Sequence, residues 1–176
     1  SLDEIAHPLI KEVFKFINPE DFLELSSFGF ASGGSGLGGS SSFLIALLSS
    51  LKLVYPEKFR SRSLADLACY IEIEILKKPI GRQDQYIASN GGISSFCYKK
   101  NGIVTEHNLN NYQIKDLEKS IKTLYLIPTG IKRKADNVLN QLKENSNSFD
   151  EFLTIRKLAE EFLNSSLSNS KDLFNI

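Results

Sequence analysis

The chain has 176 residues, of which 41% are hydrophobic and 24% are charged, a balance typical of a globular protein with a real core. Its 21 acidic and 21 basic residues cancel, so no charge excess points to nucleic acid as the main partner. No apolar run approaches the roughly 18 residues needed to span a bilayer, and no charged-then-apolar leader opens the chain. We therefore expect a cytoplasmic protein without membrane attachment.

The cysteines and histidines do not have the spacing of a zinc site or of a nucleophile triad. We expect Cys69 in a helix and Cys97 in a strand, both as reduced, buried thiols. We expect His7 and His107 at the surface, because one precedes a helix-starting proline and the other follows a strand among asparagines.

The first predicted elements lead into a glycine-rich loop. Pro8 starts an amphipathic helix that Asn18-Pro19 stops. The segment 22–30 is extended and partly alternating, which predicts a strand. The loop follows at residues 33–42 (Gly-Gly-Ser-Gly-Leu-Gly-Gly-Ser-Ser-Ser), and a buried helix begins near Ser40. The apolar positions that mark this helix are Leu44, Leu47, Leu48 and Leu51.

The composition of the loop is that of a phosphate cradle. Its five glycines can adopt positive φ and approach a ligand closely, and the next helix would direct its amides and dipole into the loop. A Walker loop is disfavoured because Gly39 stands where the phosphate-binding lysine must be. A dinucleotide fold is disfavoured because no second strand leads to an acidic residue. A purely structural glycine turn remains an alternative.

A second helix carries two candidate carboxylates. Ser63 and Asp66 have the form of a capping box, and a helical apolar stripe continues from there to Ile75. Glu72 and Glu74 fall on opposite borders of that stripe, so either could lean into a cleft. Spacing does not choose between them, and a solvated face is the alternative for each.

A polar turn and a short helix come next. Residues 81–86 (Gly-Arg-Gln-Asp-Gln-Tyr) open this helix and residues 90–92 (Asn-Gly-Gly) close it, which predicts Asp84 as its N-cap. Residues 93–98 and 103–105 then predict a β-hairpin with a short Asn-Gly turn.

The pattern changes near residue 114, where a second, ferredoxin-like half is predicted to begin. Residues 121–127 (Ile-Lys-Thr-Leu-Tyr-Leu-Ile) predict a strand and residues 128–130 a turn. A further helix is predicted from Ala135, and an amphipathic helix over residues 152–162.

Three segments, in this order, resemble motifs of the GHMP small-molecule kinases. They are residues 34–38 (Gly-Ser-Gly-Leu-Gly), then Glu72 with residues 81–86 and Gly91-Gly92, then residues 129–135 (Thr-Gly-Ile-Lys-Arg-Lys-Ala). Together they are most similar to the sugar-phosphate kinase branch typified by D-glycero-D-manno-heptose 7-phosphate kinase. The loop departs from the family pattern at Ser32, where a proline is usual, and at Gly39, where a serine is usual.

The resemblance implies an α/β (α+β) fold of two domains. Residues 1–113 would be part of the N-terminal, ATP-binding domain, a mixed sheet with helices, and residues 114–176 the beginning of a ferredoxin-like C-terminal domain. The family's opening and closing motifs are missing. The chain also begins at Ser1 and contains no methionine, so we expect a central fragment.

The resemblance also assigns roles to individual residues. The ATP phosphates would be bound by Gly34, Ser35, Gly36, Leu37, Gly38, Gly39, Ser40 and Ser41. Mg²⁺ would be held by Ser40 and Glu72 together with the phosphates. Asp84 would face the acceptor hydroxyl, either as a base or only to orient it. The acceptor would be bound by Arg82, Thr129, Gly130 and Arg133.

The activity implied is an ATP- and Mg²⁺-dependent phosphorylation of a sugar or sugar-phosphate hydroxyl. The first choice is the anomeric hydroxyl of D-glycero-D-manno-heptose 7-phosphate, with fucose, galactose or mannose as other acceptors. The alternative is a non-catalytic sensor that keeps a nucleotide or sugar pocket. Expected partners are ATP and the sugar, without nucleic acid or membrane, and a homodimer is an assembly that the resemblance allows.

Overall fold

The structure is a computed structural model that describes residues 2–20, 22–29, 36–107, 109–127, 139 and 148–164. The chain divides into two compact units. Unit 1 comprises Ser1–Gly92 and Lys132–Leu139, and unit 2 comprises Ile93–Ile131 and Asn140–Ile176. The boundary predicted from the sequence, between residues 113 and 114, stays a prediction.

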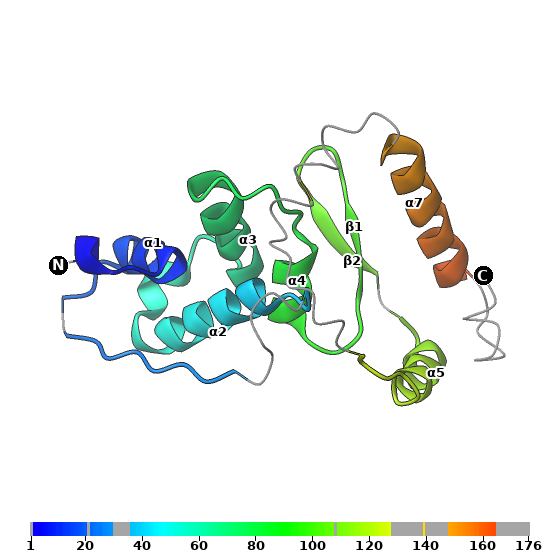
Figure 1. The fold of residues 1–176 in the computed structure, drawn as a ribbon, viewed down its shortest axis with the longest axis horizontal. Helices are drawn as coiled ribbons and strands as arrows, with labels where there is room; N and C mark the ends of the chain where they lie inside the picture. Colours follow the sequence, from blue (N-terminus) through cyan, green and yellow to red (C-terminus); the bar gives the residue numbers. More distant parts are fainter. Residues whose placement is uncertain are drawn as a thin grey trace. The chain divides into compact units, whose positions relative to one another are not determined.

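Helices α1 to α4 form the body of unit 1 (Figure 1). Their bounds are Pro8–Ile17 for α1, Gly39–Val54 for α2, Leu64–Cys69 for α3 and Gln83–Asn90 for α4. Short 3-10 turns lie at Leu2–Glu4 (η1) and Pro56–Phe59 (η2), and a π-helical segment, η3 (Tyr70–Ile75), continues α3. The predicted starts of α1 and α2 are confirmed, because Pro8 is the first residue of α1 and α2 begins one residue before Ser40.

The core of unit 1 lies where α1, α2, α3 and η3 pack together. Their apolar side chains repeat at helical spacing, so each helix turns one stripe inward. The nearly fully buried side chains include Leu9, Val13, Ile17, Leu44, Leu47, Leu48, Leu51, Leu67 and Ile71. All the apolar positions predicted for α2 belong to this core, which confirms that α2 is a buried helix.

The helix predicted from Ser63 to Ile75 changes character at Tyr70. Ser63 caps α3 by accepting a hydrogen bond from the Asp66 amide at 3.0 Å, as predicted. The next six residues form a π-helix, in which each bond spans one more residue than in an α-helix. The wider turn rotates later side chains off the α-helical stripe. Ile75, predicted on the apolar stripe, is consequently 38% exposed.

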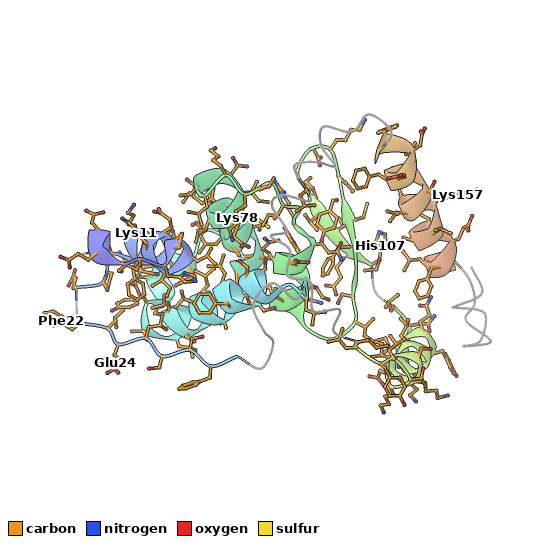
Figure 2. All side chains as sticks on the ribbon, in the orientation of Figure 1. Lys11, Phe22, Glu24, Lys78, His107 and Lys157 are labelled. Atoms are coloured by element: carbon orange, nitrogen blue, oxygen red, sulfur yellow. The ribbon has the colours of Figure 1, made fainter. Side chains whose placement is uncertain are left out.

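The segment 22–29 forms no strand, so that prediction was wrong. Among the described residues it has no ladder partner, and an extended segment becomes a strand only when a neighbour takes up its backbone hydrogen bonds. Its aromatic residues Phe22 and Phe28 are exposed. Figure 2 shows the side chains of Phe22 and Glu24 pointing away from the ribbon.

A β-hairpin in unit 2 is confirmed. Strands β1 (Ser95–Tyr98) and β2 (Val104–His107) pair antiparallel, with Ser95 opposite His107 and Tyr98 opposite Val104. The turn closes with a hydrogen bond from the Gly102 amide to the Lys99 carbonyl at 3.0 Å. Gly102 has φ 83°, a value that favours glycine.

Helix α5 (Asn111–Ile121) replaces the start of the strand predicted over residues 121–127, so that prediction was wrong. Asn110 caps α5 through a reciprocal capping box with Gln113. After α5, residues 122–127 form a turn and irregular chain without a ladder partner in the described regions. The apolar run there is exposed, Tyr125 and Ile127 included.

Helix α7 (Ser148–Asn164) contains the amphipathic helix predicted over residues 152–162, which is confirmed. The turn at 128–130 and most of the helix predicted from Ala135 lie outside the described residues. The sheet found among the described residues is the two-stranded hairpin β1–β2. Helices with a small antiparallel sheet are consistent with the predicted α/β class, whereas the mixed sheet and the ferredoxin-like half stay predictions.

Both cysteines are free thiols, as predicted, but they differ in burial. Burial raises the pKa of Cys69 to about 12, which makes its thiol unreactive. Cys97 lies in β1 and is exposed, contrary to the prediction, because a two-stranded hairpin leaves much of its surface open. His7 and His107 are exposed as predicted. Among the described residues, none of the helices combines the length and apolar character needed to cross a membrane.

Candidate functional site

The candidate site is built around Glu72, a carboxylate on η3 that is 0% exposed. Its Oε1 accepts hydrogen bonds from Ser40 Oγ and Lys78 Nζ, both at 2.8 Å. Its Oε2 accepts hydrogen bonds from Ser41 Oγ at 2.9 Å and from Gln85 Nε2 at 2.6 Å. Each oxygen of this buried group is therefore satisfied, as a charge inside a protein requires.

The partners of Glu72 keep it ionised. Burial by itself raises the pKa of Glu72, but the hydrogen bonds from Lys78, Ser40, Gln85 and Ser41 outweigh burial and hold the pKa below its ordinary value. The group is therefore a fixed negative charge at neutral pH. It lies directly behind the first turn of α2, which provides both serines.

Local backbone structure aims Lys78 at Glu72. Lys77 has a left-handed φ of 53°, which ends the helical segment, and the Lys78 amide donates to the Glu72 carbonyl at 3.0 Å. The chain thus folds back over the last turn of η3. The Lys78 ammonium returns to the carboxylate six residues earlier, and the two form a salt bridge of 2.8 Å.

The first turn of α2 has no side-chain cap among the described residues. Its N-cap is Gly38, which has φ 67° and no side chain with which to cap the first turn. Gly36 also has a positive φ, 75°, and Leu37 between them is exposed. Helix N-termini with free amides attract anions, phosphates in particular. This is the described part of the predicted phosphate loop, since Gly34 and Ser35 lie outside the described residues.

Asp84 borders this helix terminus. The N-cap of α4 is Arg82, and Asp84 is the second residue of the helix, so the prediction that Asp84 caps it was wrong. Arg82 already has nearly helical backbone angles, which starts the helix earlier than the sequence suggested. A Cβ at Gly38 would lie 3.4 Å from Asp84 Cγ and 3.5 Å from Oδ2. Asp84 is exposed, so its carboxylate is open to a ligand at the α2 terminus.

The other predicted site residues are distributed differently. Arg82 lines a pocket of about 360 Å³ whose further lining includes Arg62, Asp66, Cys69, Tyr70 and Glu74. Glu74 is exposed and pairs with Lys77 at 3.9 Å, so the structure separates it from the buried Glu72. Thr129, Gly130 and Arg133 lie outside the described residues.

Sequence reasoning missed two members of the Glu72 network, Lys78 and Gln85. Gln85 lies inside a motif that was recognised, but nothing in the motif indicated a bond to Glu72. Lys78, labelled in Figure 2, is the second of two adjacent lysines, and only its position after the helix end distinguishes it. Gln85 Oε1 is buried and has no hydrogen-bond partner within the described region.

The start of α2, with Gly38 at its N-cap position, and the buried Glu72 behind it lie in a segment that is similar to a known family. Residues 9–92 match the family model for the GHMP kinases N terminal domain. The matched segment contains α1 except for its first residue, all of α2, α3 and α4, and the whole Glu72 network. The match shows that this segment is similar to the N-terminal domain of the GHMP kinases, a family of kinases that bind ATP. Searches with the chain found no matching curated protein and no matching solved structure.

GHMP kinases use ATP and usually Mg²⁺, and the residues of the site fit that ion. The Ser40 hydroxyl and the Glu72 carboxylate are hard oxygen ligands of the kind that Mg²⁺ takes together with nucleotide phosphates. The described residues contain no cluster of three or more acidic, histidine or cysteine side chains able to hold a metal alone. The Lys78 ammonium lies within hydrogen-bond distance of both Ser40 Oγ and Glu72 Oε1, so this position attracts a cation.

Proposed function

We propose that this chain is the ATP-binding part of a kinase that phosphorylates a hydroxyl of a sugar or sugar phosphate. The first candidate acceptor is the anomeric hydroxyl of D-glycero-D-manno-heptose 7-phosphate, and fucose, galactose and mannose are the others. The observation that carries the proposal is the ionised, buried Glu72 behind an uncapped helix N-terminus, with the exposed Asp84 beside it.

In this mechanism the amides at the start of α2 bind the ATP phosphates. Ser40 and Glu72 would hold Mg²⁺, which supplies positive charge against the phosphates when it is bound. Ser41 and Gln85 keep the Glu72 carboxylate in place from its other oxygen. These groups would hold the phosphates in position and neutralise their charge. Positioning and charge neutralisation make up most of the catalysis of phosphoryl transfer.

Asp84 acts on the acceptor. The acceptor oxygen forms a bond to the γ-phosphorus, the bond from that phosphorus to the bridging oxygen breaks, and ADP leaves with the electron pair. Asp84 orients the hydroxyl and takes up its proton. Arg82, Arg133, Thr129 and Gly130 are the proposed contacts to the acceptor, and a phosphate already on the sugar would pair with an arginine.

A coupled assay of ADP release tests the proposal on the longest protein that the surrounding reading frame encodes. The acceptors are heptose 7-phosphate, mannose, fucose and galactose, each with ATP and Mg²⁺. We expect release of ADP that depends on one of these sugars. Binding of nucleotide without turnover on any of them would contradict the kinase and favour the non-catalytic sensor.

Asp84→Asn is the sharpest single variant. Loss of the charge should lower kcat by about 10²–10⁴, the usual size of a positioned acid–base contribution. The melting temperature and the Kd for Mg²⁺-ATP should not change, because Asp84 is exposed and is not the N-cap of α4. A folded variant that turns over within about threefold of its parent would remove Asp84 from the mechanism.

A further inference from the structure

We propose that Lys78 is a built-in cation that holds the metal position of the ligand-free protein and has to leave before a divalent ion can bind there. The proposal rests on the proposed function in one respect, the assignment of Ser40 and Glu72 as the metal ligands. It adds a competitor, within the same chain, for the site that they form.

Three polar atoms meet at this position. Lys78 Nζ lies 2.8 Å from Glu72 Oε1 and 3.0 Å from Ser40 Oγ, and these two oxygens lie 2.8 Å from each other. A magnesium ion bound to both oxygens would lie about 2.0–2.1 Å from each. The ammonium and the ion would then share one small volume and repel each other. Occupation by Lys78 and occupation by the metal therefore exclude each other.

The two oxygens of Glu72 have different kinds of partner, which lets the exchange occur without disturbing the carboxylate. Oε2 is held by Ser41 and Gln85, two neutral donors on buried side chains. Oε1 is held by Ser40 and Lys78, at the edge of the site. When Lys78 leaves, the bonds to Oε2 remain and keep the carboxylate aimed at the ion.

Lys78 is able to leave. Its side chain is 24% exposed and carries its charge on a flexible four-carbon stem. Its backbone stays fixed by the bond from its amide to the Glu72 carbonyl. The ammonium can thus move into solvent by rotation of the stem alone, while the turn after η3 is unchanged.

The exchange lowers the affinity for metal in a measurable way. When a site is free for only a fraction of the time, the apparent Kd rises in inverse proportion to that fraction. If Lys78 fills the position about nine-tenths of the time, its removal should lower the Kd for a divalent ion about tenfold. Lys78 therefore sets how much metal the empty protein binds without nucleotide.

The test is a titration of the full chain with Mn²⁺ alone, in which electron paramagnetic resonance measures the free ion. Lys78→Met should bind Mn²⁺ about tenfold more tightly than the parent. Lys77→Met is the matched control, because its ammonium is exposed and lies 3.9 Å from the exposed Glu74. It removes the same charge one residue away and should leave the Kd within about twofold.

An unchanged or higher Kd in a folded Lys78→Met protein would overturn the proposal and leave Lys78 as an ion-pair partner of the fold. If Lys78→Met fails to fold, Lys78→Gln keeps a donor for Glu72 without the charge, and the same tighter binding is expected. In the parent protein, saturating Mn²⁺ should increase acetylation of Lys78, read by mass spectrometry, and leave Lys77 unchanged. If the rate of Lys78 acetylation is the same with and without Mn²⁺, the proposal is also overturned.

These measurements use neither nucleotide nor sugar, so the two proposals fail separately. If the protein has no kinase activity but Lys78→Met binds Mn²⁺ more tightly than the parent, the exchange between Lys78 and the metal stands and the proposed function is ruled out. If the protein is an active kinase and its Kd for Mn²⁺ is the same in Lys78→Met as in the parent, the proposed function stands and the exchange between Lys78 and the metal is ruled out.

Discussion

Glu72 and Glu74 lie two positions apart in the sequence, yet one is buried and the other is exposed. The π-helical turn of η3 brings Glu72 into the core and leaves Glu74 exposed. Burial would neutralise an isolated carboxylate, so the charge of Glu72 depends on its donors. A helical wheel with 100° per residue does not contain a π turn, which is why spacing could not choose between the two glutamates.

Gly38 has a left-handed backbone conformation and lies at the candidate site. We predict that Gly38→Ala lowers both the stability of the protein and its affinity for nucleotide. A left-handed φ of 67° costs a residue with a Cβ about 1–2 kcal/mol, and the new methyl group would contact Asp84 Cγ at 3.4 Å. Denaturant unfolding should show the loss of stability, and nucleotide affinity should fall as the amides shift.

Gly39→Ala provides the control for Gly38→Ala. Gly39 is the first residue of α2, its φ is not positive, and a Cβ there would have no described atom within 4 Å. This variant should be as stable as the parent or slightly more stable, because alanine loses less chain entropy than glycine. Equal effects of the two substitutions would contradict the role given to the backbone of Gly38.

At the scale of elements, a hydrogen bond between two side chains joins α4 to α3. The Tyr86 hydroxyl donates to Asp66 Oδ1 at 2.6 Å, and the Ser63 hydroxyl donates to Asp66 Oδ2 at 2.7 Å. The hydrogen bonds from Tyr86 and Ser63 hold the pKa of Asp66 below its ordinary value of 3.8. Asp66 thus binds the N-cap residue of α3 through one carboxylate oxygen and the middle of α4 through the other.

Tyr86→Phe should therefore reduce stability in a pH-dependent way. We expect a loss of about 1 kcal/mol at pH 7, discounted for the exposure of Asp66. The folded pKa of Asp66 is lowered, so its contribution is complete above the unfolded value of 3.8 and is lost as the pH falls through the folded pKa. Urea unfolding of parent and variant should give a difference that narrows below about pH 4.

Tyr70→Phe is the control for this experiment. The Tyr70 ring lies 4.3 Å below the Arg62 guanidinium, a contact that phenylalanine keeps. Its effect on the free energy of unfolding should not vary between pH 3 and pH 7. A Tyr86→Phe difference that stays constant over the same range would contradict the part given to the Asp66 charge.

The elements that the sequence predicted correctly are those whose signals are local. The ends of α1 and the stripe of α2 follow from Pro8, Asn18-Pro19 and helical spacing. The strands predicted over residues 22–30 and 121–127 were wrong because a strand needs a neighbouring strand. The alternation of side chains in one segment does not show whether such a neighbour exists.

The candidate site could be predicted only in part, for a related reason. The glycine-rich loop, Ser40, Glu72 and Asp84 lie in motifs, and a motif indicates the chemistry of single positions. The hydrogen bonds from Lys78 and Gln85 to Glu72 join residues 6 and 13 positions apart. They depend on the left-handed turn at Lys77 and on the packing of α4, which a sequence pattern does not specify.

The whole molecule consists of two units with separate internal contacts, and this predicts that a core change in unit 1 stays in unit 1. Leu48 on α2 is 0% exposed, so Leu48→Ala should lower the stability of unit 1 by about 2–5 kcal/mol. The slowest amides of α2 should then exchange with deuterium at least about 30-fold faster, since 1.4 kcal/mol is a factor of ten. The amides of β1 and β2 should keep their rates, and Leu53→Ala, at an exposed position of α2, should change neither set. Equal acceleration in α2 and in the hairpin would mean that the two units unfold as one cooperative body.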